Sequence, residues 1–294
     1  MLVVIAIIAL LIGILLPALG SARASAYATV NLSNLRSLGQ GMQMYLNDND
    51  QMMPFRLPSG QTHESSGRPR ARWHFPVGDY VGQPYTPRNE QEFAAFTGGE
   101  DGGSRNDDMP WIDNDVFRDP THDVEDFMAD NGEIKALRNG SYGYNYQYLG
   151  NTRDQGPNGS AANFPVRGIH IRAHSRTIVI ADSMGNQNRY LTGTGNREHA
   201  YSLDPPRLDT ERNNAASFAQ SDGVSPADPR HGGKATVAFL DGHAERRTHE
   251  QLGYVLDPDQ PGKVLEDLGD NSLWNGLGFD DAAEDQNGLI RPRP

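Results

Sequence analysis

The first 19 residues form the most apolar segment of the chain. Leu2 to Leu19 is an 18-residue run without a charged or hydrogen-bonding side chain, broken at Gly13 and Pro17. As a helix, the run is about 27 Å long, which is enough to cross a bilayer core. Proline is tolerated in membrane helices, so we expect Pro17 to bend this helix without ending it. Residues 1–20 are therefore predicted to span a membrane.

From residue 21 the pattern changes to polar residues with an apolar residue every three or four positions. On a helix this spacing forms one stripe, made by Ala28, Leu32, Leu35, Leu38, Met42 and Tyr45. No proline occurs between Pro17 and Pro54. We expect one continuous helix of more than 40 residues, roughly 65 Å long. Its first part, 1–20, is apolar all round, and its continuation, 21–50, is amphipathic and packs on its own domain.

Beyond residue 50 the chain alternates short apolar runs with clusters of Gly, Pro, Asn and Asp, which indicates short elements and long loops. Loops are expected over 56–72 and 97–109, and a short helix within Asp123–Arg138. The predicted strands are Ser141–Leu149, with Tyr142, Tyr144, Tyr146 and Tyr148 on one face, Gly168–Arg172 and Arg176–Ala181. The fold class is α+β: a long hydrophobic helix and a body, 51–294, with an antiparallel sheet.

The clearest local pattern in the body is a hairpin within 231–247. Two alternating runs flank Asp241 and Gly242, and an Asp-Gly pair between strands favours a two-residue turn in which both residues have positive φ. His231 precedes this turn, with nine residues between it and Asp241. We expect a structural role for these residues, with His231 at the entry of the strand and Asp241 and Gly242 at the turn.

Charge and composition exclude several classes of protein. The net charge is −12, and it lies beyond residue 50 because Arg23, Arg36, Asp48 and Asp50 cancel one another. An acidic body repels phosphate backbones, so no nucleic-acid partner is expected. The absence of Cys excludes thiol catalysis, iron–sulfur clusters and disulfides. No Gly-x-Ser-x-Gly or phosphate-binding Gly-x-x-x-x-Gly-Lys pattern occurs, so neither a hydrolase nor a nucleotide-binding protein has local support.

A metal site is the alternative use of the histidines. His231, Asp241 and His243, with Asp182 or His199 brought in by folding, supply a His/carboxylate donor set. The residues between His231 and Asp241 span about 30 Å when extended, so these two side chains share one ion only if the chain folds back. Three acidic turns, at 47–50, 113–115 and 267–270, offer oxygen ligands to a hard cation. None of them matches a calcium-loop pattern.

The segment from Met1 to Leu19, followed by Ser21, Ala22 and Arg23, closely resembles the N-terminal helix of type IV prepilin-like proteins, especially the pseudopilins of type II secretion. The pattern at 34–39 and the helix exit at 45–50 resemble the same family, so the likeness covers about 50 residues. It implies a single-pass protein of the bacterial inner membrane whose body lies in the periplasm or on the cell surface. The membrane and assembly helix then comprises Leu2, Val3, Val4, Ile5, Ile7, Ile8, Leu10, Leu11, Ile12, Gly13, Ile14, Leu15, Leu16 and Pro17.

The body carries a second resemblance, to the prepilin-type group with a His, nine residues, Asp-Gly signature. His231 with Asp241 and Gly242 matches it, and 141–145, 177–182 and 272–276 resemble further motifs of the group. Many relatives have Cys-Pro where this chain has Asp119-Pro120, so any disulfide of that region is lost here. Because pseudopilins often use calcium in a C-terminal loop, the resemblance suggests a calcium ion without assigning its ligands.

Family members carry a short basic leader ending in Gly, followed by Phe-Thr-Leu-Ile-Glu, ahead of the stretch that starts here at Met1. We expect that leader upstream in frame, the start having been placed too far downstream. The resemblance implies a structural subunit that assembles with copies of itself, other pseudopilins and the secretion or pilus machinery. A separate motor hydrolyses ATP, so no enzymatic activity is expected. The alternative is a membrane-tethered periplasmic binding protein or metal-dependent enzyme that uses His231, Asp241 and His243.

Overall fold

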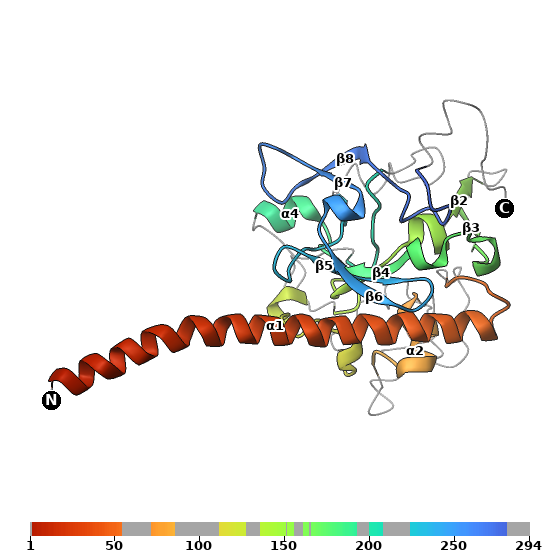
Figure 1. The fold of residues 1–294 in the computed structure, drawn as a ribbon. Coiled ribbons are helices and arrows are strands. Elements are labelled where there is room, and N and C mark those ends of the chain that lie inside the picture. The colour runs from red at the N-terminus through yellow and green to blue at the C-terminus, as the bar shows by residue number, and fades with distance from the viewer. Residues whose placement is uncertain are drawn as a thin grey trace.

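The computed structural model describes residues 2–54, 72–85, 112–127, 136–150, 152–155, 161–164, 166–192, 200–207 and 224–280. The loops predicted at 56–72, apart from Arg72, and at 97–109 lie outside these residues, and so does His199. In the described part the fold is α+β, as the sequence predicts: one long helix lies against a body of antiparallel sheets (Figure 1).

Helix α1 runs without a break from Leu2 to Asp48 and includes Pro17. The prediction of a single helix of more than 40 residues is therefore confirmed. Pro17, which lacks the N–H of a helical hydrogen bond, is exposed in the first half of the helix. That half projects from the body and curves gently (Figure 1).

The second half of α1 is built into the main hydrophobic core. Its apolar stripe faces the body: Leu35, Leu38 and Met42 are fully buried, Ala28 and Tyr45 are buried, and Leu32 is half-buried. Two glycines let neighbouring elements approach closely. A Cβ on Gly39 would lie 3.4 Å from Ala238, and one on Gly41 would lie 2.6 Å from Val81.

The body is organised around a four-stranded antiparallel sheet with the strand order β1-β4-β5-β6. Its strands are β1 (Tyr142–Tyr144), β4 (Ile178–Asp182), β5 (Ala235–Phe239) and β6 (Ala244–Arg247). Both faces of the central strands are covered. Val179 and Ala238 belong to the core shared with α1, whereas Val237 and Phe239 belong to a second core on the other face.

Shorter elements surround this sheet. Two further antiparallel pairs are β2 (Thr152–Gln155) with β3 (Ala161–Phe164), and β7 (Tyr254–Leu256) with β8 (Val264–Gly269). The second core is closed by Trp274, whose ring is fully buried and whose Nε1 donates to the carbonyl of Leu252. The helices are α2 (His74–Val81), α4 (Gln187–Thr192) and the short η1 (Asp115–Phe117), η2 (Val124–Phe127), η3 (Tyr146–Gly150), η4 (Gly168–His170), η5 (His174–Arg176) and η6 (Glu250–Leu252).

Two strand predictions are wrong. The tyrosine-rich run Ser141–Leu149 is a strand for three residues and then becomes the π-helical turn η3, so its four tyrosines do not share one sheet face. Asn145 causes the change, because its side chain donates to the carbonyls of Ile178 and Trp274 and accepts from the N–H of Tyr148. The run Gly168–Arg172 contains the 3₁₀ turn η4 and no strand. The helix expected within Asp123–Arg138 is present as η2, followed by residues outside the described part.

The β5–β6 hairpin forms, but its turn differs from the predicted one. The N–H of Phe239 donates to the carbonyl of His243, which leaves three residues in the loop, with Gly242 alone at positive φ (86°). A three-residue loop that ends in a left-handed glycine is the next commonest hairpin connection. The prediction that Asp241 also has positive φ is therefore wrong.

Candidate assembly helix and buried ionic cluster

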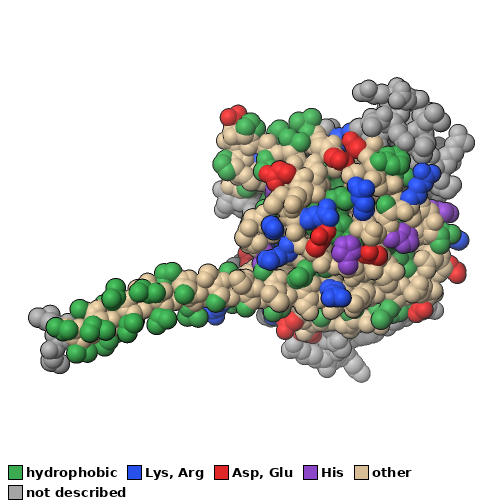
Figure 2. Space-filling view, viewed as in Figure 1, with side chains coloured by type: hydrophobic (Ala, Val, Ile, Leu, Met, Phe, Trp, Pro, Cys, Tyr) green, Lys and Arg blue, Asp and Glu red, His purple; other side chains and the backbone are tan. Residues whose placement is uncertain are grey.

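The N-terminal half of α1 is an apolar arm that contacts no other described element. Figure 1 shows this arm leaving the body, and Figure 2 shows it covered with apolar side chains while the body carries mixed charges. Twelve large apolar side chains between Val3 and Leu19 are each 49–71% exposed. By length and composition, one helix among the described residues, Val3–Asp48, can cross a membrane. The chain therefore carries one candidate single-pass membrane anchor.

Polar side chains fix the second half of α1 to the body. Asn34 donates from Nδ2 to the carbonyl oxygens of Asp115 and Arg118, at 2.9 and 3.1 Å. Gln43 donates to the carbonyl oxygen of Leu240 in the hairpin turn. At the end of the helix, the Tyr80 hydroxyl of α2 donates to Asp48 Oδ2 over 2.9 Å. The helix is thus attached to the body along its second half by hydrogen bonds as well as by the core.

Asn31 makes the most buried of these attachments. Its side chain is fully buried, and its Nδ2 donates to Asp182 Oδ1 at 2.8 Å and to Thr236 Oγ1 at 2.9 Å. Its Oδ1 accepts a 2.5 Å hydrogen bond from the hydroxyl of Tyr142. Asn31 therefore connects α1 to three strands of the sheet, because its partners lie on β1, β4 and β5.

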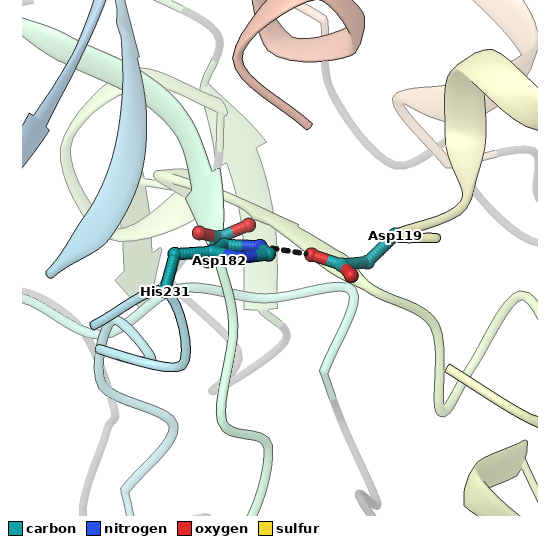
Figure 3. Close-up of side chains that lie close together, drawn as sticks. All are labelled: Asp119, Asp182 and His231. Atoms are coloured by element: carbon teal, nitrogen blue, oxygen red, sulfur yellow. Dashed lines mark hydrogen bonds and ion pairs between the residues drawn. The ribbon is translucent and has the colours of Figure 1, made fainter. Parts of the chain in front are cut away.

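Asp182 belongs to a buried ionic cluster that also contains Asp119, Asp228, Arg230 and His231. His231 Nε2 lies 2.7 Å from Asp119 Oδ2, and both side chains are shielded from solvent (Figure 3). Arg230 lies between carboxylates, with Nη1 3.7 Å from Asp119 Oδ2 and Nη2 3.1 Å from Asp228 Oδ2. We refer to these five residues as the ionic cluster.

Two backbone carbonyls and the side chain of His122 also contact the guanidinium of Arg230. Its Nη2 donates to the carbonyl oxygen of Ser183 at 2.6 Å and, more weakly, to that of Ser141 at 3.3 Å. Its Nη1 lies 2.7 Å from His122 Nε2, and His122 Nδ1 lies 2.8 Å from Ser141 Oγ. The guanidinium therefore links the segment that precedes β5, to which Arg230 belongs, to the residues next to the ends of β1 and β4.

The surroundings separate the pKa values of the two central carboxyl groups. Burial raises the pKa of Asp182 to about 6, and the nearby Asp119 adds to this, while Arg230 and the donors Asn31 and Thr236 oppose it. Burial also acts to raise the pKa of Asp119, but the hydrogen bond from His231, the charge of Arg230 and the bonds from Thr121 outweigh it and lower this pKa to about 2. Asp119 is therefore the firmly ionised member of the pair.

The predicted site residues separate into two places. His231 lies inside the ionic cluster, whereas Asp241 lies at the exposed hairpin turn, where its Oδ1 is 2.5 Å from His243 Nδ1. His231 lies before the start of β5, and Asp241 lies after its end. The described structure therefore does not bring His231, Asp241 and His243 together as one set of ligands. Asp182, the residue expected to be brought in by folding, does join His231.

Four residues of this region are not predicted from the sequence as members of a site: Asn31, Asp119, Asp228 and Arg230. The sequence marks Asp119 only as the position where many relatives have a cysteine. A signal was present for Asn31, because it lies between the stripe residues Ala28 and Leu35, on the side of the helix that turns toward the body. No local pattern marks Arg230, since its partners come from distant segments.

Comparison of the chain with protein-family models, with curated proteins and with solved structures found no match. A functional proposal therefore rests on the geometry described above and on the resemblance of the N-terminal segment and body motifs to prepilin-type sequences.

Proposed function

We propose that this chain is a pseudopilin-like structural subunit. In the proposal, α1 holds it in the bacterial inner membrane, its body faces the periplasm or the cell surface, and the same helix assembles it into a type II secretion or type IV pilus-like fibre. The observation that carries the proposal is the division of α1, a single helix whose first half is bare and apolar while its second half forms part of the core (Figure 1).

Burial of the exposed apolar side chains of the arm is strongly favourable. Complete burial of a large aliphatic side chain contributes roughly 1.5–3 kcal/mol, so twelve side chains that are 49–71% exposed represent on the order of 10–20 kcal/mol. In a single subunit, these side chains are buried in lipid. In a fibre, they are buried against the arms of neighbouring subunits. Lipid tails are as apolar as the arm, so association depends on close packing, which small residues such as Ala6, Ala9 and Gly13 permit.

The rigid attachment favours a fibre subunit over a tethered enzyme. A tethered catalytic domain needs no fixed orientation relative to its anchor, and a flexible linker serves it. Here the helix passes from the arm into the body without a break, and Asn31, Asn34 and Gln43 fix it there. Packing of the arms therefore dictates the position of each body, which ordered assembly requires.

No observation favours the alternative, a binding protein or metal-dependent enzyme that uses His231, Asp241 and His243. These residues lie at two separate places in the described structure, and His231 is buried. A substrate has no described route to His231.

Charge placed on the arm tests the membrane part of the proposal. Leu11→Asp puts a carboxylate in the middle of the arm, which costs roughly 2.5–3.5 kcal/mol in a membrane helix. We expect the variant, expressed from its native locus, to leave the membrane fraction or to be degraded, with loss of fibres. Leu268→Asp is the matched control, because Leu268 is 49% exposed on the body and Leu11 is 54% exposed. Equal behaviour of the two variants in fractionation and fibre formation argues against the proposal.

Cross-linking separates assembly from simple anchoring. The chain has no cysteine, so a single introduced thiol reports contacts between copies without background. We expect Leu11→Cys to give disulfide-linked dimers in oxidised membranes and Leu268→Cys to give few. If the arm only anchors a monomer, the two variants form equally few dimers, and the fibre proposal is wrong.

A further inference from the structure

The ionic cluster holds more negative than positive charge. Asp119 and Asp182 are fully buried, Asp228 is 2% exposed, and the guanidinium of Arg230 faces them. Three carboxyl groups thus face one guanidinium, so acidic side chains outnumber this basic side chain by two. Burying uncompensated charge is unfavourable, so a bound cation would stabilise the ionised carboxylates.

Three members of the cluster are arranged as ligands. Asp119, Asp182 and His231 each offer one ligand atom, and these atoms lie within 4.8 Å of one another. Figure 3 shows the imidazole of His231 pointing toward the carboxyl group of Asp119. Asp119 comes from the loop before η2, and Asp182 from the end of β4. Two carboxylates and one imidazole suit a divalent transition metal. Calcium and magnesium prefer oxygen ligands alone.

Neighbouring hydrogen bonds hold the carboxylates in position. Thr121 donates to Asp119 Oδ1 from its N–H (2.8 Å) and its hydroxyl (2.5 Å), so Oδ2 is the oxygen that faces His231. Asn31 and the N–H of Thr236 each occupy one oxygen of Asp182, and each oxygen keeps a second acceptor position. Such outer hydrogen bonds orient ligands in metal sites.

We propose that Asp119, Asp182 and His231 form a buried site for one divalent transition-metal ion. The ion supplies positive charge to a cluster in which carboxyl groups outnumber the guanidinium, and it ties the Asp119 loop to β4 and to the segment before β5. It takes the place of the His231–Asp119 hydrogen bond: His231 binds through Nε2 without a proton and keeps its remaining proton on Nδ1. Arg230, 3.7 Å from Asp119, is the opposing charge that limits the affinity. The site is independent of the fibre proposal.

Metal analysis of the full chain in detergent tests the site. The protein is treated with a chelator, incubated with Zn²⁺ or Mn²⁺, dialysed, and analysed for bound metal and thermal unfolding. We expect about one ion per chain, and a Tm about 5–10 °C higher at a metal concentration roughly 100-fold above the dissociation constant. Less than about a tenth of an ion per chain, with an unchanged Tm, overturns the proposal.

Matched variants locate the ion. His231→Gln and Asp182→Asn should lose the ion and the shift in Tm. His243→Gln and Asp241→Asn alter the exposed His–Asp pair at the hairpin turn and should keep both. Loss of binding in the turn variants with retention in the cluster variants refutes the assignment.

If the cluster variants do not fold, Co²⁺ added to the wild-type protein decides the question. Visible absorption bands of Co²⁺ bound through nitrogen and carboxylate ligands, removed by competing Zn²⁺, support the site. Their absence overturns it.

Discussion

Replacing Asn31 with alanine tests how the long helix is attached to the body. Asn31 is fully buried in α1, and its side chain makes three hydrogen bonds, to Asp182, Thr236 and Tyr142. Alanine removes all three and leaves a carboxylate oxygen and a buried tyrosine hydroxyl each without its partner from the helix.

The magnitude follows from the partners that are lost. A hydrogen bond to a charged group contributes about 1.5–3 kcal/mol, and a buried polar group left unsatisfied costs about 1–3 kcal/mol. We therefore expect Asn31→Ala to lower the free energy of unfolding by about 3–5 kcal/mol. This is a large share of the roughly 5–15 kcal/mol that stabilises a typical protein.

Urea denaturation of the full chain in detergent measures this loss, and Asn34→Ala is the matched control. Asn34 lies one helical turn away on α1, and its Nδ2 donates to two backbone carbonyls at a partly exposed position. Both variants gain the same helix propensity, and water replaces the bonds of Asn34, so its loss should be about 0.5–1.5 kcal/mol. A loss below about 1 kcal/mol for Asn31→Ala, or equal losses in both variants, refutes the reasoning.

Three other measurements test the packing and the charges. The pKa of Asp182 is raised from 3.8 to about 6. Between these two pH values, the folded state holds a proton on Asp182 that the unfolded state has released. In the presence of a chelator, the stability of the wild type relative to Asp182→Asn should fall by roughly 2 kcal/mol from pH 4 to pH 6.5, and a flat or rising difference contradicts the assignment. Gly41→Ala places a methyl group 2.6 Å from a valine of α2, whereas a methyl on Gly39 meets its neighbours at 3.4 Å. Thermal unfolding should therefore show Gly41→Ala less stable than Gly39→Ala by about 1–3 kcal/mol. Trp274→Phe loses the hydrogen bond to Leu252 and should cost about 1–3 kcal/mol in the same assay, with no loss of membrane localisation.

The long helix could be predicted because its pattern is local. An apolar run followed by apolar residues at every third or fourth position specifies a helix and its buried side, whatever the body contains. The strand at Arg176–Ala181 was also predicted correctly, within two residues at its start.

The tyrosine run shows where local patterns fail. Alternation of apolar and polar residues predicts a strand through Leu149, but the carbonyls of Ile178 and Trp274 offer Asn145 partners from distant parts of the chain. Those bonds end β1 at Tyr144 and start the π-helical turn. The tertiary contact decided the conformation of residues whose own preference was for a strand.

By itself, the sequence determined a membrane-length apolar helix with an amphipathic continuation and an α+β body, because hydrophobic periodicity and turn residues act over a few positions. It did not determine the ionic cluster. Asp119 and His231 are 112 residues apart, and Asn31 and Asp182 are 151 residues apart. Folding decided these partners, because a buried charge has to find a partner wherever the packed elements bring one within reach.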